Sequence, residues 1–251
     1  TTPGPVAFLD ESYRAPGFSD ERPFYAISAV TFARDQMDQV REVLTDIVGG
    51  LYWHTTEAFQ LGRTSDITSM ARYIADQVHW SVVTVEATVT SRGGMDEARQ
   101  TCLAALAREV TRGSGPGAVR LLVAEATNDP LTNAADRRTI ETLRAGGDVD
   151  RYVTLYHGSP GMEPLLWTAD AVAWAARRAL ALDDTRWIDQ VRDVLTVLDA
   201  RTGRPLDMKH PQAAAATPGG RQPVSEREAV VADPSLQHRR PERLEVDETH
   251  G

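Results

Sequence analysis

The pattern of hydrophobic and polar positions changes abruptly near the start of the chain. Val6-Ala7-Phe8-Leu9 is an unbroken apolar run, and Asp10-Glu11-Ser12 follows it at once. A short run without alternation predicts a strand that is buried on both faces. The two carboxylates are then expected just past the C-terminal end of the strand, where open α/β sheets place their ligands. An acidic, solvated turn would produce the same local pattern.

Apolar runs and helical repeats alternate along the rest of the chain. Further strands are predicted over residues 24–32, 80–90, 119–124 and 151–156, with 24–32 antiparallel to the first strand. Helical spacing predicts helices over residues 35–48, 65–77, 95–111, 133–145, 163–182 and 186–198. Residues 51–62 are expected to be irregular. This alternation predicts an α/β fold, a mixed sheet with helices packed around it.

The last fifth of the chain differs in composition from the rest. From Thr202 onward it is rich in Pro, Ala, Gly and charged residues. Such a segment offers too little apolar surface to offset the entropy lost on ordering. We therefore predict one domain over residues 1–200 and a flexible tail over residues 201–251.

Composition narrows the class of protein. The chain has 251 residues, of which 41% are hydrophobic and 25% charged, as in soluble globular proteins. Its net charge of −9 argues against a generic nucleic-acid coat protein, which would carry a basic patch. Acidity does not exclude a nucleic-acid enzyme, because a carboxylate site for divalent metals itself adds negative charge.

Cysteine usage and hydropathy bear on location. Cys102 is the only cysteine, so neither an internal disulfide nor a cysteine-based zinc site is possible, and a buried, inert thiol is expected. The start lacks the pattern of a signal peptide. The most apolar helix carries Asp170, Arg177 and Arg178, which favours a core helix over a membrane span. Together these features predict a cytoplasmic protein.

A second acid follows a second buried strand. The apolar strand 119–124 ends at Glu125, as the first strand ends at Asp10. If the two strands are parallel neighbours, about 4.8 Å apart, the two carboxylates meet at one end of the sheet. Like charges that close are unfavourable unless a cation or a proton lies between them. Acidic strand ends are also common by chance.

Asp170 lies within an apolar stripe of its helix. Its neighbours at three and four positions are Leu166, Trp167, Ala173 and Trp174. An unpaired buried carboxylate is very costly, so Asp170 must be paired, hydrogen-bonded or bound to metal. A salt bridge, for example to Arg177, is the structural alternative to a metal ligand.

Asp10, Glu125 and Asp170 together suit Mg²⁺ or Mn²⁺, which prefer oxygen ligands. Two such ions can activate water and stabilise a leaving oxygen in phosphodiester hydrolysis. His54 and Glu57 lie in an irregular segment and could add a ligand, a proton carrier or a phosphate contact, although a surface histidine would look the same.

Other polar residues receive structural interpretations. The alternation of strand 80–90 puts Glu86 on its polar face, where we expect it to be solvated. His157 and Ser159 have no partner that the sequence reveals, and no hydrolytic triad is built from them.

Three motifs, in this order, resemble domain-of-unknown-function family 3800. They are Phe8-Leu9-Asp10-Glu11-Ser12, Trp53-His54-Thr55-Thr56-Glu57 and the helix segment Leu165–Ala173 that contains Ala169-Asp170. The resemblance covers about residues 6–182. The chain departs from the family pattern at Tyr13, where glycine is usual, at Trp167, where glutamine is usual, and at Glu125, where aspartate is commoner.

The resemblance implies an RNase H-like fold and a metal-dependent nuclease. It matches Asp10 to the acid of the first strand, Glu125 to the acid of a later central strand and Asp170 to the acid of the last helix. Glu11 and His54 match motif positions and would assist. The implied substrate is nucleic acid, with DNA and RNA both open. A binding or regulatory protein that keeps the fold without turnover is the competing class.

Overall fold

The computed structural model describes residues 4–17, 23–78, 80–113 and 118–206. A mixed sheet of six strands runs through this part of the chain, in the order β5-β4-β1-β2-β3-β6. The strands are β1 (Val6–Arg14), β2 (Phe24–Phe32), β3 (Trp80–Glu86), β4 (Leu121–Glu125), β5 (Thr154–Gly158) and β6 (Leu195–Asp199). β1, β2 and β3 pair antiparallel, whereas the β1–β4, β4–β5 and β3–β6 pairs are parallel.

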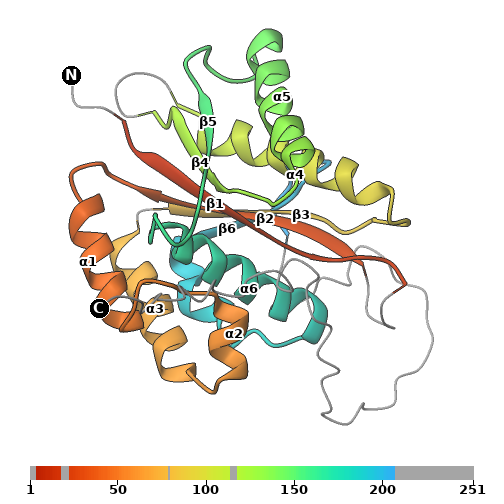
Figure 1. Ribbon diagram of the computed structural model, residues 1–251. Helices are drawn as coiled ribbons and strands as arrows, with labels where there is room; N and C mark the ends of the chain where they lie inside the picture. The colour runs from red at the N-terminus through yellow and green to blue at the C-terminus, as the bar shows by residue number, and fades with distance from the viewer. Residues whose placement is uncertain (1–3, 18–22, 79, 114–117, 207–251) are drawn as a thin grey trace, which may run out of the picture. The chain divides into compact units, whose positions relative to one another are not determined.

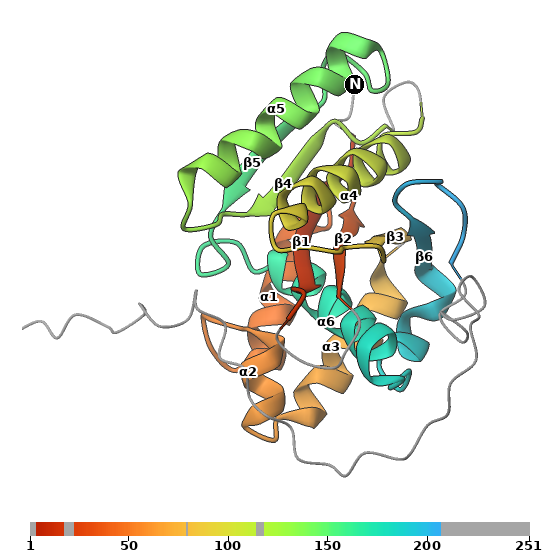
Figure 2. The ribbon, with the colours of Figure 1, turned by 90° about the vertical axis from the view of Figure 1, so that its right-hand side faces the viewer.

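Helices cover both faces of the sheet (Figures 1 and 2). They are α1 (Met37–Val48), α2 (Thr55–Gln60), α3 (Thr64–Gln77), α4 (Gly94–Val110), α5 (Pro130–Gly146), α6 (Leu166–Leu182) and the 3-10 helix η1 (Ile188–Val194). α4 and α5 lie on one face, and α1, α2, α3 and α6 on the other (Figure 1). The mixed sheet with flanking helices confirms the predicted fold class.

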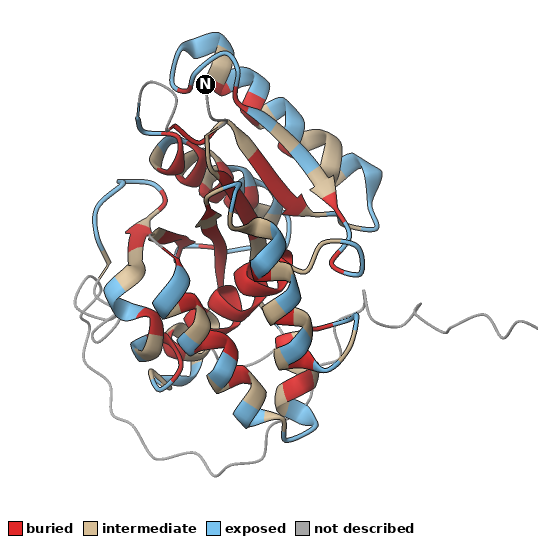
Figure 3. Ribbon diagram, turned by 90° about the vertical axis from the view of Figure 1, so that its left-hand side faces the viewer, coloured by how far each residue is buried: buried red, intermediate tan, exposed pale blue. Residues whose placement is uncertain are grey.

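β1 is buried on both faces, as its unbroken apolar run predicts. Val6 and Phe8 belong to the core on the α6 side, whereas Ala7 and Leu9 belong to the core on the α4 side. Successive side chains of a strand point to opposite faces, so a strand between two helical layers must be apolar throughout. Figure 3 shows the resulting buried layers on either side of the sheet.

β1 continues beyond the predicted strand end. The first strand was expected to stop before Asp10, but its antiparallel pairing with β2 extends to Arg14. Its parallel pairing with β4 stops at Leu9 opposite Ala124. The first acids therefore lie inside a strand, at the point where one of its two neighbours ends. The local sequence does not carry this information, because the extension depends on β2.

Predicted strand 80–90 ends at Glu86, and predicted strand 151–156 begins only at Thr154. Two other segments adopt a different type of secondary structure from the predicted one. Residues 51–62 were expected to be irregular but contain α2. Residues 186–198 were expected to be one helix but form η1 and then β6, which pairs with β3. A short apolar run is compatible with either a helix or a strand. It forms a strand here because it pairs with the edge of β3.

Glu86 is buried and not solvated, contrary to the prediction from alternation. Its side chain is 2% exposed and forms an ion pair with Arg201. It also accepts hydrogen bonds from the backbone and the hydroxyl of Thr88. The prediction was wrong because α4 covers the face of β3 that the sequence marks as polar. Thr84 on that face donates a hydrogen bond to the Cys102 carbonyl at 2.9 Å.

Cys102 is buried in α4, as predicted. Burial raises the pKa of its thiol to about 12, which keeps it protonated and unreactive. After β6 the chain turns back, and the backbone of Leu206 donates a hydrogen bond to the Val197 carbonyl at 2.8 Å. The rest of the predicted flexible tail, from residue 207, lies outside the described residues. Among the described helices, none is long and apolar enough to cross a membrane.

Candidate functional site

Asp10 faces α6 from the middle of the sheet. It pairs across the ladder with Ser28 of β2, and directly opposed residues share a face. The Ser28 hydroxyl donates a hydrogen bond to the Ala169 carbonyl of α6 at 2.7 Å. Asp10 is half-buried, and its side chain is thereby directed toward the residue that precedes Asp170.

Glu125 lies beside Asp10 on the same face. β1 and β4 are parallel neighbours, as the sequence-based hypothesis required, and the register pairs Leu9 with Ala124. Asp10 and Glu125 are the next residues on these two strands, so they lie side by side on adjacent strands. On the other side of Glu125, the register places Gly158 of β5. The row across the sheet is thus carboxylate, carboxylate, glycine.

Asp170 meets the same region from α6. Its carboxylate is buried, and Oδ2 accepts hydrogen bonds from the backbone N–H and the hydroxyl of Thr55, each at 2.7 Å. Trp53 Nε1 in turn donates to the Thr55 hydroxyl at 2.8 Å. Among the described residues no ion pair of Asp170 is found, so the alternative interpretation of a salt bridge to Arg177 does not account for its burial. It holds the N-terminus of α2 instead.

The charges of Glu125 and Asp170 both act on the carboxyl group of Asp10. Burial raises the pKa of Asp10 well above its usual range, and the charges of Glu125 and then Asp170 raise it further. Desolvation and like charges both disfavour the ionised form. Asp10, Glu125 and Asp170 therefore behave as one electrostatic cluster, which we call the carboxylate cluster.

His54 is the sequence neighbour of Thr55, which contacts Asp170 of the cluster. It immediately precedes α2 and is bonded to Thr55, the partner of Asp170. Its Nδ1 atom is buried and has no hydrogen-bond partner in the described part of the structure. Such orphaned atoms are uncommon in native folds and often mark a site for water, an ion or a ligand. Glu57, also considered from the sequence, accepts a hydrogen bond from the Tyr52 hydroxyl at 3.4 Å.

Glu11 points away from the carboxylate cluster. Successive side chains on β1 alternate, so Glu11 faces α4, where Arg99 Nη1 lies 2.5 Å from its carboxylate. The sequence grouped Glu11 with Asp10 as an assisting residue, and this placement separates the two. The alternation of a strand, which extends past Asp10, is the physical reason.

Arg99 is the centre of a second polar network that the sequence did not reveal. It donates to both carboxylate oxygens of Asp136 at 2.8 and 2.9 Å and to the Tyr25 hydroxyl at 2.8 Å. His157, for which the sequence offered no partner, has its Nε2 3.1 Å from Asp136. One signal was present: Arg99 lies at helical spacing from apolar residues of α4 and had to be paired if buried.

Metal coordination stays a prediction. Within the described ranges, no three histidine, cysteine, aspartate or glutamate side chains are grouped so that they could hold one metal ion. The donor chemistry of the carboxylate cluster fits a hard cation, because Mg²⁺ and Mn²⁺ prefer carboxylate oxygens. The cluster is therefore a candidate for metal binding by its chemistry and charge.

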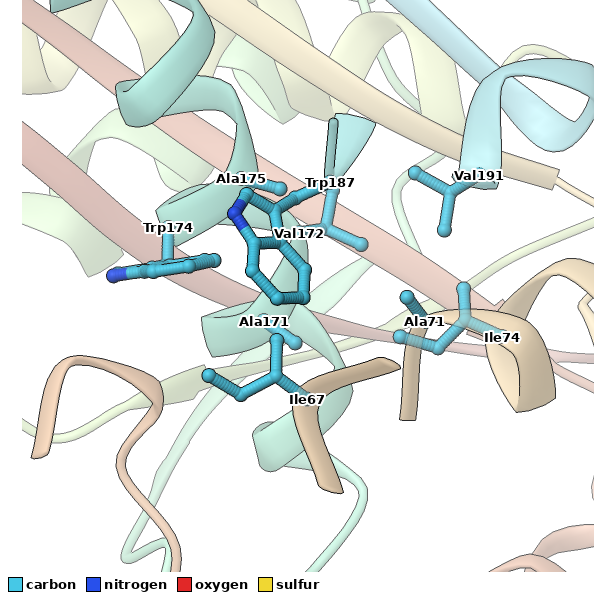
Figure 4. A pocket seen from close by; sticks show the side chains of 9 residues that line it. All are labelled: Ile67, Ala71, Ile74, Ala171, Val172, Trp174, Ala175, Trp187 and Val191. Atoms are coloured by element: carbon cyan, nitrogen blue, oxygen red, sulfur yellow. The ribbon is translucent and has the colours of Figure 1, made fainter. Parts of the chain in front are cut away.

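A cavity elsewhere does not compete for this role. A space of about 10 Å³ lies between α3, α6 and η1 (Figure 4). Its lining is apolar: Ile67, Ala71, Ile74, Ala171, Val172, Trp174, Ala175, Trp187 and Val191. It is no larger than one water molecule, and among its lining side chains only the indole N–H groups of Trp174 and Trp187 are polar, so it is too small and too apolar to bind a substrate.

Comparison with known proteins gives distant structural likenesses only. No protein-family model matches the chain, and no curated protein does. The ribonuclease H2 from Pyrococcus horikoshii OT3 has 14% identity and a TM-score of 0.41, with 75% of this chain and 76% of that chain covered. RNase HII from Archaeoglobus fulgidus, in its complex with PCNA, gives 14% and 0.43 over the same shares.

A third solved structure is Bst-RNase HIII in complex with Mn²⁺, at 10% identity and a TM-score of 0.40. The match covers 76% of this chain but only 54% of that one. The sheet itself combines an antiparallel β1-β2-β3 meander with β4 and β5 added in parallel beyond β1 and β6 added in parallel beyond β3.

Proposed function

We propose that this chain hydrolyses phosphodiester bonds of nucleic acid with the help of Mg²⁺ or Mn²⁺. The observation that supports the proposal is the carboxylate cluster: Glu125, at the end of the parallel neighbour of β1, and Asp170, in the helix packed on the same face, both raise the pKa of Asp10. Maintaining like charges there is costly, as the raised pKa of Asp10 indicates. Functional sites are where such perturbed groups gather.

In this proposal Asp10 and Glu125 would hold the metal from the sheet, and Asp170 would complete the site from α6. The metal would supply charge neutralisation at the phosphate and a more acidic water. Asp170 also fixes α2 through Thr55, which keeps His54 beside the cluster. His54 would carry a proton or contact a phosphate. By the motif resemblance, the chain would be a divergent member of domain-of-unknown-function family 3800.

A binding or regulatory protein without turnover is the second candidate. One observation favours it: Oδ2 of Asp170 already accepts two hydrogen bonds from Thr55. That commitment leaves this oxygen less available to a metal. In this alternative the carboxylates would shape a site that binds without cleaving.

The test is a cleavage assay with labelled single-stranded and duplex DNA and RNA. We expect cleavage with Mg²⁺ or Mn²⁺ and none with Ca²⁺, whose longer bonds and higher coordination number misplace the attacking water. Asp10→Asn should abolish cleavage because it removes charge and little volume. Asp76→Asn, at an exposed position of α3, is the matched control and should cleave like the wild type.

Calorimetric titration of Mn²⁺ into the same proteins separates the two candidates. Metal binding that Asp10→Asn abolishes, together with cleavage, supports the nuclease. Equal cleavage by the wild type and Asp10→Asn would instead reveal a contaminating enzyme. Nucleic-acid binding without cleavage or metal uptake would favour the binding protein.

A further inference from the structure

The outer edge of the sheet next to the carboxylate cluster carries exposed aromatic rings. β5 is an edge strand (Figure 2). Tyr156 on this strand is 64% exposed, and Tyr152, two residues before the strand, is 57% exposed. Tyr152 and Tyr156 are the most exposed aromatic side chains among the described residues, and their place on a sheet edge makes this edge a candidate interaction surface.

Tyr156 lies on the same face as the carboxylates. A Cβ placed on Gly158 would lie 3.5 Å from Val123 of β4, 3.7 Å from Leu166 of α6 and 3.7 Å from the Tyr156 ring. Tyr156 and Gly158 therefore share the α6 face of β5. Two residues along a strand span roughly 7 Å. The Tyr156 backbone therefore lies about that far along β5 from Gly158, which is in the row with Asp10 and Glu125.

Gly158 leaves the outer end of that row without a side chain. The parallel register places Glu125 beside Gly158 and Val123 beside Tyr156. No side chain at position 158 thus separates the exposed ring from the carboxylates. A chain lying along β5 would pass the ring and reach the carboxylate cluster at the end of the strand.

Two guanidinium groups lie at the other end of β5. Arg151 stacks on the Tyr152 ring with its Cζ 4.7 Å from the centroid, and Arg120 lies 5.7 Å from the same centroid. Arg151 also donates to the Tyr152 hydroxyl at 2.6 Å. Asp150 offsets part of this charge, since it is 3.5 Å from Arg120. One net positive charge remains among these three side chains.

We propose that the β5 strip, made of Tyr152, Tyr156, Arg120 and Arg151, binds a single nucleic-acid strand and leads it to the carboxylate cluster. This inference rests on the proposed function and names its substrate class. Aromatic rings that stack bases, interleaved with arginines that meet phosphates, are the usual composition of single-strand binding surfaces. The rings are sequence-tolerant platforms, so the strip selects single strands over duplexes, whose bases are already stacked.

The experiment measures the binding of a short fluorescent single-stranded oligonucleotide in Ca²⁺, so that cleavage does not consume the probe. Tyr156→Ala should weaken binding roughly 5- to 150-fold, the equivalent of about 1–3 kcal/mol for one stacked base. Tyr156→Phe keeps the ring and should bind like the wild type. An abasic oligonucleotide of equal length should not distinguish Tyr156→Ala from the wild type.

Salt dependence tests the arginines separately from the rings. Arg151→Ala should reduce the slope of log affinity against log salt by about 0.7, the contribution of one phosphate contact on a single strand. Tyr156→Ala should leave that slope unchanged. The matched controls are Tyr13→Ala, an exposed ring on the opposite face of the sheet, and Arg72→Ala, an exposed arginine of α3. Both should bind like the wild type.

The outcomes separate this inference from the proposed function. Cleavage by the wild type with unchanged binding by Tyr156→Ala would overturn the β5 strip and leave the nuclease intact. Binding that depends on Tyr156, without cleavage, would support the strip and count against the nuclease. A wild-type dimer that Tyr156→Ala converts to a monomer, with oligonucleotide binding unaltered, would make the edge a contact between copies and overturn the strip.

Discussion

Asp10 is the acid of the carboxylate cluster whose ionised form is most disfavoured by folding. Burial comes first and the charges of Glu125 and Asp170 second in raising its pKa. A carboxyl whose pKa is raised by folding binds its proton more tightly in the folded chain than in the unfolded chain. Its contribution to stability is therefore full below the unfolded pKa, near 3.9, and is lost as the pH rises through the folded pKa.

Asp10→Asn should accordingly stabilise the metal-free protein at neutral pH. The gain should shrink toward zero in acid, as Asp10 of the wild type becomes protonated. Thermal unfolding in a chelator across this pH range measures the difference between the two proteins. A variant that is less stable than the wild type at neutral pH would show that Asp10 is held by favourable contacts.

Asp170 plays a structural part as well as its proposed one. Asp170→Ala removes the acceptor of two hydrogen bonds and leaves the backbone N–H and the hydroxyl of Thr55 without it. We expect a loss of roughly 3 kcal/mol, because hydrogen bonds to charged groups and stranded buried donors are both costly. Asp170→Asn retains a carbonyl acceptor and should lose less.

A double-mutant cycle with Thr55→Val measures the Asp170 interaction by chemical denaturation in chelator. A coupling energy of about 1 kcal/mol or more between the two positions is expected for groups in direct contact. Additive effects would mean that Asp170 owes its place to something other than Thr55.

At the scale of elements, the Arg99 network joins the sheet to its α4–α5 layer. Arg99 of α4 contacts Glu11 of β1, Asp136 of α5 and Tyr25 of β2, and Asp136 contacts His157 of β5. Burial alone would raise the pKa of Asp136, but the hydrogen bonds from His157 and Arg99 lower it overall. Its contribution to stability is thus present above the unfolded pKa and is lost in acid.

Arg99→Met should destabilise the protein by about 3–5 kcal/mol, because it leaves buried Asp136 and half-buried Glu11 without their shared arginine. Arg108→Ala on the same helix is the control. Its pair with Asp148 is exposed and should contribute no more than about 1 kcal/mol. Urea denaturation of both variants makes the comparison, and equal losses would contradict the assigned role of burial.

Asp136→Asn adds a pH test of the same network. Its deficit relative to the wild type should be largest at neutral pH and should narrow as acid protonates Asp136 of the wild type. A deficit that is constant across the acid range would mean that the charge of Asp136 contributes nothing.

At the scale of the whole molecule, contacts with the core extend past residue 200, the predicted end of the domain. Arg201 pairs with buried Glu86, and Leu206 packs against the core. A chain that ends after Leu206 should keep the thermal midpoint of the full chain, as the tail composition predicts. A chain that ends after Ala200 should lose roughly 1–3 kcal/mol, because Glu86 loses its cation. Equal midpoints for both truncations would contradict the contribution of Arg201.

The sequence by itself determined most elements of the fold and singled out the acids of the carboxylate cluster. β2 begins and ends at the predicted residues, and the unbroken apolar runs of β1 and β4 identify strands between two layers. Asp170 was recognisable because a carboxylate in an apolar stripe must have a partner. These inferences succeed because burial on both faces and helical periodicity are written in the local order of residues.

Only the tertiary structure decided which side chains share a face and which partners they meet. Glu11 faces away from Asp10 because β1 continues as a strand past both residues. Glu86 is buried because α4 covers its face of β3. Residues 195–199 form β6 because they pair with the edge of β3. The Asp170 carboxylate accepts hydrogen bonds from Thr55 and does not pair with an arginine in the described part of the chain. Each outcome depends on register and on layers contributed by distant segments, and a local pattern of polar and apolar residues does not encode them.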